Sequence, residues 1–121
     1  QWGRGVVTAL AALLIGSSAA ASELFATADG NAFAEGLRPP LTQLLTTNTV
    51  TVTVTGAAGP VTHSWAFVSG NNIFTISDST AAAVSWSVLA SIIVREAIWR
   101  DTVSDGVSIV TVDVTVSAFL S

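Results

Sequence analysis

The strongest constraint on the fold of this chain is a strict alternation of valine and threonine. Val50, Val52 and Val54 are each flanked by threonine, and the same two-residue period returns over residues 109–116. Successive side chains of a β-strand point to opposite faces, so each stretch predicts a strand with one apolar face and one hydroxyl-bearing face. The chain must therefore contain β-sheets that are buried on one side.

Further alternating stretches separated by turn residues follow residue 48. The turn signals include Gly56–Pro60, Ser69–Asn72 and Ser104–Gly106. About six or seven short strands bounded in this way predict an all-β, Ig-like antiparallel β-sandwich. Three tryptophans share the apolar parity of their strands and are predicted to lie in the core: Trp65, Trp86 and Trp99.

The first third of the chain has a different composition and predicts a separate N-terminal arm. Residues 6–21 carry no charge, which predicts a short apolar helix, and Pro39 and Pro40 interrupt any helix that reaches them. Glu23–Leu37 reads as a loop with short turns. The predicted organisation is an assembly arm over residues 1–46 and a sandwich domain over residues 47–121. A signal-like or membrane-associated segment, or a helix packed on its own domain, are the alternatives for the apolar run.

Charge and residue usage exclude several classes of function. Only 10% of residues are charged, the net charge is −4, and cysteine, methionine and tyrosine are absent. An acidic chain with four basic residues has no electrostatic surface for nucleic acid. Such low charge predicts a surface covered by neighbouring subunits, and therefore a homo-oligomer or a larger assembly.

Candidates for catalysis or metal binding are few. His63 is the only histidine, and no Gly-x-Ser-x-Gly motif accompanies it. Asp101 and Asp105 share one strand face but lack a calcium-binding loop pattern. The sequence therefore predicts no enzyme, no cofactor and no metal site.

Three segments resemble the Ig-like or PKD-like domains of tailed-bacteriophage virion proteins. Residues 59–70 (GPVTHSWAFVSG) are similar to the Gly-x-Pro-aromatic-Thr-aromatic-x-Trp-x-x-Val-Ser-Gly stretch of those domains. Residues 97–105 (AIWRDTVSD) resemble their later aromatic-Arg-Cys-Thr-Val-x-Asp strand, and residues 111–116 their closing strand. The resemblance implies a structural virion protein, either a capsid decoration protein or a tail accessory protein, that acts by assembly with other virion proteins and with copies of itself.

Two residues depart from that family pattern. His63 stands where the family usually has an aromatic residue, and Asp101 stands where it usually has cysteine. Both have the inward parity of their strands, and in an Ig-like layout these strands are neighbours. We therefore expect His63 and Asp101 to form a half-buried pair, because a buried carboxylate needs a partner. The alternative is that Asp101 lies near a sheet edge and reaches water.

The predicted assembly contacts lie mainly in the arm. The interface candidates are Trp2, Arg4, Leu10, Leu13, Leu14 and, on a strand of the sandwich, Arg100. Two other functions remain open. One is a subunit of a prokaryotic surface filament or adhesin, with the apolar segment inside the filament. The other is a receptor- or carbohydrate-binding fibre domain, which needs an exposed aromatic residue such as Trp86.

Overall fold

The computed structural model describes residues 23–121, and these residues form strands and loops without any helix. The strands are β1 (Phe25–Ala28), β2 (Ala32–Gly36), β3 (Thr42–Thr46), β4 (Val50–Thr55), β5 (Thr62–Gly70), β6 (Thr75–Ile76), β7 (Ala83–Val84), β8 (Trp86–Ser91), β9 (Arg95–Ser104) and β10 (Ile109–Leu120). The predicted all-β fold is confirmed.

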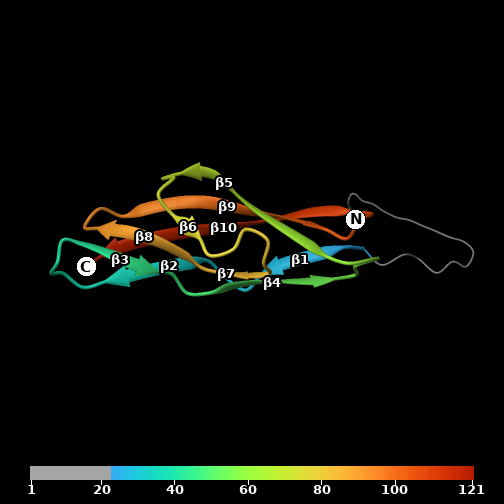
Figure 1. Ribbon diagram of the computed structural model, residues 1–121, viewed down its shortest axis with the longest axis horizontal. Coiled ribbons are helices and arrows are strands. Elements are labelled where there is room, and N and C mark those ends of the chain that lie inside the picture. The colour runs from blue at the N-terminus through green and yellow to red at the C-terminus, as the bar shows by residue number, and fades with distance from the viewer. Residues whose placement is uncertain (1–22) are drawn as a thin grey trace, which may run out of the picture.

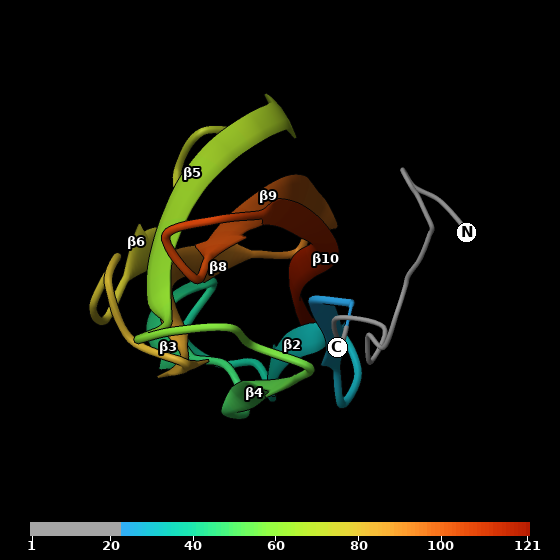
Figure 2. The same cartoon turned by 90° about the vertical axis from the view of Figure 1, so that its right-hand side faces the viewer.

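The strands form two layers that face each other across one core (Figures 1 and 2). One layer is a four-stranded sheet in the order β2-β10-β9-β5, in which β2 runs parallel to β10 and the other pairs are antiparallel. The second layer contains the sheets β1-β4-β7 and β3-β8-β6. These two sheets follow one another lengthwise, because β3 leads into β4 and β7 leads into β8.

The core is made by the apolar faces that the alternation predicted. Val50 and Val52 of β4 are buried, as are Val114 and Val116 of β10. The three tryptophans are buried as well, and this prediction is confirmed. They form a chain of aromatic contacts, with ring centroids 5.5 Å apart for Trp65 and Trp86 and 5.9 Å apart for Trp86 and Trp99. The Trp65–Trp86 contact is edge-to-face, with an interplanar angle of 86°, and such a contact adds to the stabilisation from burial.

The structure corrects the predicted boundary at residue 46. Residues Glu23–Leu37, expected to be a loop, contain β1 and β2, and β3 also belongs to the sandwich. Ala32 and Ala34 of β2 are buried, and β2 pairs with β10 in the four-stranded sheet. An alanine-rich segment has little intrinsic preference for strands, so its pairing with β10 and β4 overrides local propensity.

The predicted apolar helix of the arm falls within residues 1–22, outside the described residues. From Glu23 to the last residue, no helix has the length and apolar character needed to cross a membrane.

Candidate functional site

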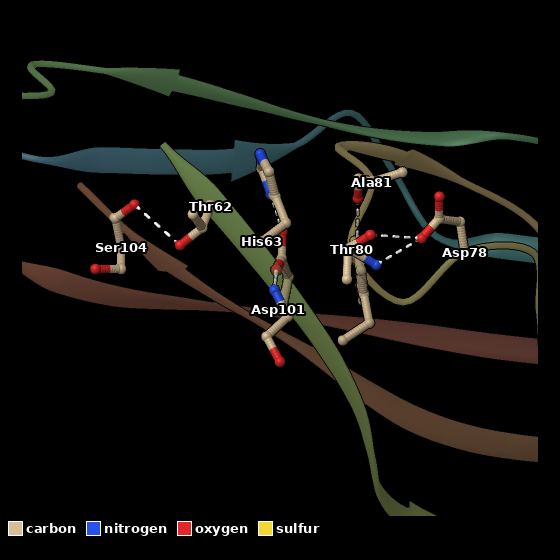
Figure 3. Close-up of polar contacts among 9 residues, drawn as sticks. Thr62, His63, Asp78, Thr80, Ala81, Asp101 and Ser104 are labelled. Atoms are coloured by element: carbon tan, nitrogen blue, oxygen red, sulfur yellow. Dashed lines mark hydrogen bonds and ion pairs between the residues drawn. The ribbon is translucent and has the colours of Figure 1, made fainter. Parts of the chain in front are cut away.

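His63 and Asp101, the two residues that depart from the family pattern, lie next to each other inside the sandwich. His63 is on β5 opposite Val103, and Asp101 is on β9 opposite Trp65, so the two are diagonal neighbours on the inward face. His63 Nδ1 lies 2.6 Å from Asp101 Oδ2 (Figure 3). A carboxylate oxygen accepts hydrogen bonds, so this contact is a hydrogen bond in the tautomer that carries its proton on Nδ1.

The carboxylate of Asp101 is completely buried, and both of its oxygens have partners. Its relative exposure is 0%, while the His63 side chain retains 10%. The backbone N–H of Ser64 donates to Oδ1 at 3.0 Å. The alternative hypothesis, in which Asp101 lies near a sheet edge and reaches water, is therefore wrong. Two hydrogen bonds from β5 instead offset the desolvation of the carboxylate.

Among residues 23–121, no hydroxyl group is hydrogen-bonded to His63 as an activated nucleophile would be. Nucleophilic catalysis needs a hydroxyl within hydrogen-bond reach of the imidazole. Over residues 23–121 no serine or threonine hydroxyl is bonded to the His63 ring; Thr62 Oγ1 donates to the Ser104 carbonyl, and Thr80 Oγ1 donates to Asp78 (Figure 3). The geometry is that of a polar cross-strand contact joining β5 to β9.

Asp105 organises the turn between β9 and β10. Its carboxylate accepts hydrogen bonds from the N–H groups of Val107 (2.9 Å), Ser108 (2.7 Å) and Ala58 (2.8 Å). These three bonds, led by that from Ala58, lower the pKa of the Asp105 carboxyl. Because Ala58 lies between β4 and β5, Asp105 ties two turns together at one end of the sandwich.

Asp101 and Asp105 do not converge on a common ligand position. Each carboxylate is bonded to its own set of protein donors. Among residues 23–121, no group of three or more histidine, aspartate or glutamate side chains is arranged to hold a metal ion.

Arg100, expected to take part in contacts between subunits, has a partner in its own chain. It lies opposite Asp113 in the β9–β10 pairing, and its Nε and Nη2 donate to the two carboxylate oxygens at 2.7 Å and 3.1 Å. The hydrogen bond from Arg100 lowers the pKa of Asp113, and the carboxylate raises the pKa of Arg100. Both side chains remain about half exposed, so the pair lies on the outer face of the sheet. The other interface candidates, Trp2, Arg4, Leu10, Leu13 and Leu14, fall outside the described residues.

The sequence reasoning missed a concentration of exposed apolar side chains at one end of the sandwich. Leu44 of β3 and Leu89 of β8 lie directly opposite each other and point outward, with 75% and 62% of their surfaces exposed. The β2–β3 and β8–β9 loops meet at the same end, because Thr42 pairs with Ser91 (Figure 1). We call this region the apolar end and define it by six exposed residues: Leu37, Leu41, Leu44, Leu89, Ile92 and Ile93.

A local signal for the apolar end existed in the sequence. Three consecutive apolar residues, 92–94, lie directly before Arg95, in a loop position where polar residues are usual. The placement of Leu44 opposite Leu89 had no such signal, because it depends on the pairing of β3 with β8.

Comparison with known proteins supports the fold and nothing finer. No family model matches the chain, and no curated protein matches it. Among solved structures, the chain is similar to the solution structure of the PKD domain (329–428) from human KIAA0319, with a TM-score of 0.51 and 18% sequence identity. The match covers 88% of this chain and 92% of that one. The fold is PKD-like and therefore Ig-like. At this level of identity the likeness concerns architecture alone.

Proposed function

We propose that this protein is a non-enzymatic structural module that acts by protein–protein assembly in an extracellular particle. The observation that carries the proposal is the apolar end, where Leu44 and Leu89 stand outside a well-packed core. Exposed apolar clusters of this kind mark protein contact sites. The low charge of the chain supports the same interpretation, since a surface with few charges is better suited to burial between subunits.

The particle that we favour is the virion of a tailed bacteriophage, with this protein as a capsid decoration protein or a tail accessory protein. Support comes from the resemblance of residues 59–70 and 97–105 to Ig-like virion domains. A PKD-like fold is compatible with this role but is shared by domains of many functions. In this proposal the partners are other virion proteins and further copies of the chain.

The alternative is a subunit of a prokaryotic surface filament or adhesin. It is supported by the uncharged stretch of residues 6–21, which this alternative buries inside the filament, and by the apolar end as a further surface for contact between subunits. A receptor- or carbohydrate-binding role has lost its main support, because Trp86, the aromatic residue that would have to be exposed, is completely buried.

Fractionation of the native source tests the proposal. Mass spectrometry on separated phage heads, phage tails and cell-surface fractions should find the protein in heads, as a decoration protein, or in tails, as a tail accessory protein. Detection only in cell-surface fibres would replace the virion proposal with the filament alternative. Detection only as a free monomer outside any particle would overturn both forms of the assembly proposal.

A further inference from the structure

We propose that the Asp29–Gly30 pair, where the chain crosses from β1 to β2, is a site of spontaneous conversion to isoaspartate in the folded protein, and that the Asp105–Gly106 pair is protected from the same reaction. The sequence contains these two Asp-Gly pairs and no other. Both lie between two strands, so the sequence alone does not distinguish them. The inference concerns a covalent modification and does not depend on the proposed assembly function.

The reaction joins the side chain of an aspartate to the backbone nitrogen of the next residue. The Gly30 nitrogen attacks Asp29 Cγ, an N–Cγ bond forms, and the Cγ–OH bond breaks, so that the hydroxyl group leaves with the N–H proton as one water molecule. A second water molecule then opens the five-membered imide ring at one of its two carbonyl groups. Opening at the carbonyl next to Cα leaves the main chain running through Cβ and Cγ, which is isoaspartate, and opening at Cγ restores aspartate. Water is the only co-reactant.

Both reacting groups of the Asp29–Gly30 pair are accessible. Asp29 is exposed, and in the described part of the chain its carboxylate accepts one hydrogen bond, from the Thr51 N–H at 3.0 Å. The Gly30 N–H has no hydrogen-bond partner among residues 23–121. Glycine has no Cβ to obstruct the attack, and the space beside Gly30 is empty, since a Cβ placed there would meet no atom within 4 Å. The nitrogen and the carboxyl group are therefore free to approach each other.

Both reacting groups of the Asp105–Gly106 pair are held by hydrogen bonds. The carboxylate accepts its three backbone N–H groups, and the Gly106 N–H donates to Ser104 Oγ at 3.1 Å. Asp105 is only 4% exposed, which limits access of the water that opens the ring. The backbone hydrogen bonds, led by that from Ala58, also lower the pKa of the Asp105 carboxyl. The ionised form has no hydroxyl group to lose, so this shift further slows the reaction.

The hydrogen bonds give the size of the expected difference. Four of them oppose the reaction at Asp105–Gly106, and one opposes it at Asp29–Gly30. Each hydrogen bond corresponds to about a factor of two or more in an equilibrium constant. The three additional bonds therefore predict that the folded chain forms isoaspartate at residue 29 about tenfold faster, or more, than at residue 105.

Isoaspartate at residue 29 would disturb the crossing between the two layers. Asp29 donates its N–H to the Thr51 carbonyl at 3.1 Å and accepts the Thr51 N–H, which continues the β1–β4 pairing by one residue. Asn31 accepts the Asn48 side-chain amide on its carbonyl and the Thr115 N–H on its Oδ1, both at 3.1 Å. One extra main-chain carbon changes the spacing between these two anchor points. We therefore expect the modified chain to have a lower melting temperature.

The experiment follows isoaspartate at the two sites over time in the full chain. One sample is kept folded in neutral buffer, and a second is unfolded in concentrated urea. A glutamate-specific protease releases the two sites in separate peptides, residues 24–35 and 97–121, and chromatography with mass spectrometry separates their isoaspartyl and aspartyl forms. We expect formation about tenfold faster, or more, at residue 29 in the folded chain and similar rates at both sites in urea.

Two results would overturn the proposal. One is an equal or faster rate at residue 105 in the folded chain, and the other is a folded chain that stays unmodified at residue 29 while the unfolded chain reacts. Incubation in water enriched in the heavy oxygen isotope tests the chemistry, because the water that opens the ring supplies one oxygen of the product. An isoaspartyl peptide without the heavy isotope would exclude the imide route.

Asp29→Glu is the matched control for the structural consequence. Glutamate keeps the carboxylate, but its ring would have six members and closes far more slowly. The melting temperature of the wild type should fall as isoaspartate accumulates, whereas the variant, first checked for folding by circular dichroism, should keep its starting value. An equal fall in the variant, or no fall in a modified wild type, would overturn the assignment of the crossing as the point that the modification weakens.

Discussion

Two regions of the molecule depart from the usual placement of apolar residues inside and charged residues outside. The inner face of β9 buries a charged residue type, and the outer face of β3 and β8 exposes apolar residues. Asp101 places a carboxylate at 0% exposure, while Leu44 and Leu89 leave most of their apolar surface outside. The buried carboxylate is satisfied within the molecule, by His63 and by the backbone of Ser64. The two leucines lie opposite each other in the β3–β8 pairing, but each remains more than 60% exposed within residues 23–121.

The buried carboxylate of Asp101 has its hydrogen-bond partners within the molecule, whereas the exposed leucines are not covered by any described residue. A polar group in the core is tolerated when its hydrogen bonds are complete, and Asp101 meets that condition. An exposed apolar pair gains its burial only from a further surface. We therefore interpret the His63–Asp101 pair as part of the fold and the apolar end as part of an interface. The two regions should respond differently to substitution.

Removal of one member of the buried pair should have the largest effect on stability. Asp101→Ala leaves His63 Nδ1 and the Ser64 N–H without partners in the core, and we expect a loss of about 2–5 kcal/mol in the free energy of unfolding, because each buried group left without a partner costs about 1–3 kcal/mol. Urea denaturation of the full chain measures it. Asp101→Asn keeps an acceptor and should lose less. If Asp101→Ala lowers the free energy of unfolding by no more than an ordinary surface substitution does, the pair is dispensable for stability.

Replacing both members together sharpens this prediction. The double variant His63→Phe, Asp101→Leu removes the donor and the acceptor at once, so no buried group is left without a partner. We expect it to be more stable than Asp101→Ala, because replacing both partners of a buried hydrogen bond by apolar groups can be nearly neutral. A double variant as unstable as Asp101→Ala would indicate that packing, and not polar satisfaction, limits this site.

Substitution at Asp105 should have the next largest effect and should change the pH dependence of stability. Asp105→Ala removes three backbone hydrogen bonds from two turns, and we expect a loss of about 1–3 kcal/mol. Since the folded pKa of Asp105 is lowered from 3.8, its contribution is present above that value and is lost as the pH falls through the folded pKa. Urea denaturation from neutral pH to below pH 3.8 should therefore show a shallower acid decline for the variant. An unchanged pH profile would contradict this role.

The exposed leucines should contribute little to the stability of the single chain. Leu44→Thr with Leu89→Thr removes apolar surface that is already in water, and threonine suits a strand, so we expect a change of less than about 1 kcal/mol. Thermal melting at a concentration too low for association is the measurement. A much larger loss would mean that the two side chains support the fold, and would remove the contrast with Asp101.

The smallest effect is expected for the exposed ion pair of Arg100 and Asp113. Both side chains lie on the outer face, where water and salt screen their attraction. Arg100→Gln and Asp113→Asn should each lower the melting temperature by less than Asp101→Asn, and the difference from wild type should shrink at high salt. A salt-independent loss would indicate that the guanidinium acts through packing.

Several features could be predicted because they depend on local parity. The inward faces of β4 and β10, the burial of the three tryptophans and the inward direction of His63 and Asp101 all follow from the two-residue period. Parity alone does not place His63 next to Asp101, since neighbouring inward residues can be offset along the strands. The assignment of β5 as neighbour of β9 came from the resemblance to Ig-like domains.

Other features escaped prediction because tertiary pairing overrides local composition. Phe25–Ala28 and Ala32–Gly36 are rich in alanine and give weak strand signals, yet they complete both layers through β4 and β10. The chain between β1 and β2 passes from one layer to the other, and no local sequence pattern predicts this crossing. The predicted boundary at residue 46 was wrong for this reason.

The sequence by itself determined that this protein is built from strands with one buried face, because the side-chain period of a strand is a property of the backbone and needs no partner. Only the tertiary structure decided which residues meet. The register of β5 against β9 brings His63 Nδ1 to 2.6 Å from Asp101, and the pairing of β3 with β8 brings Leu44 opposite Leu89 on the outside. Such contacts join residues far apart in the chain, and they form only when the strands pair in this order and register.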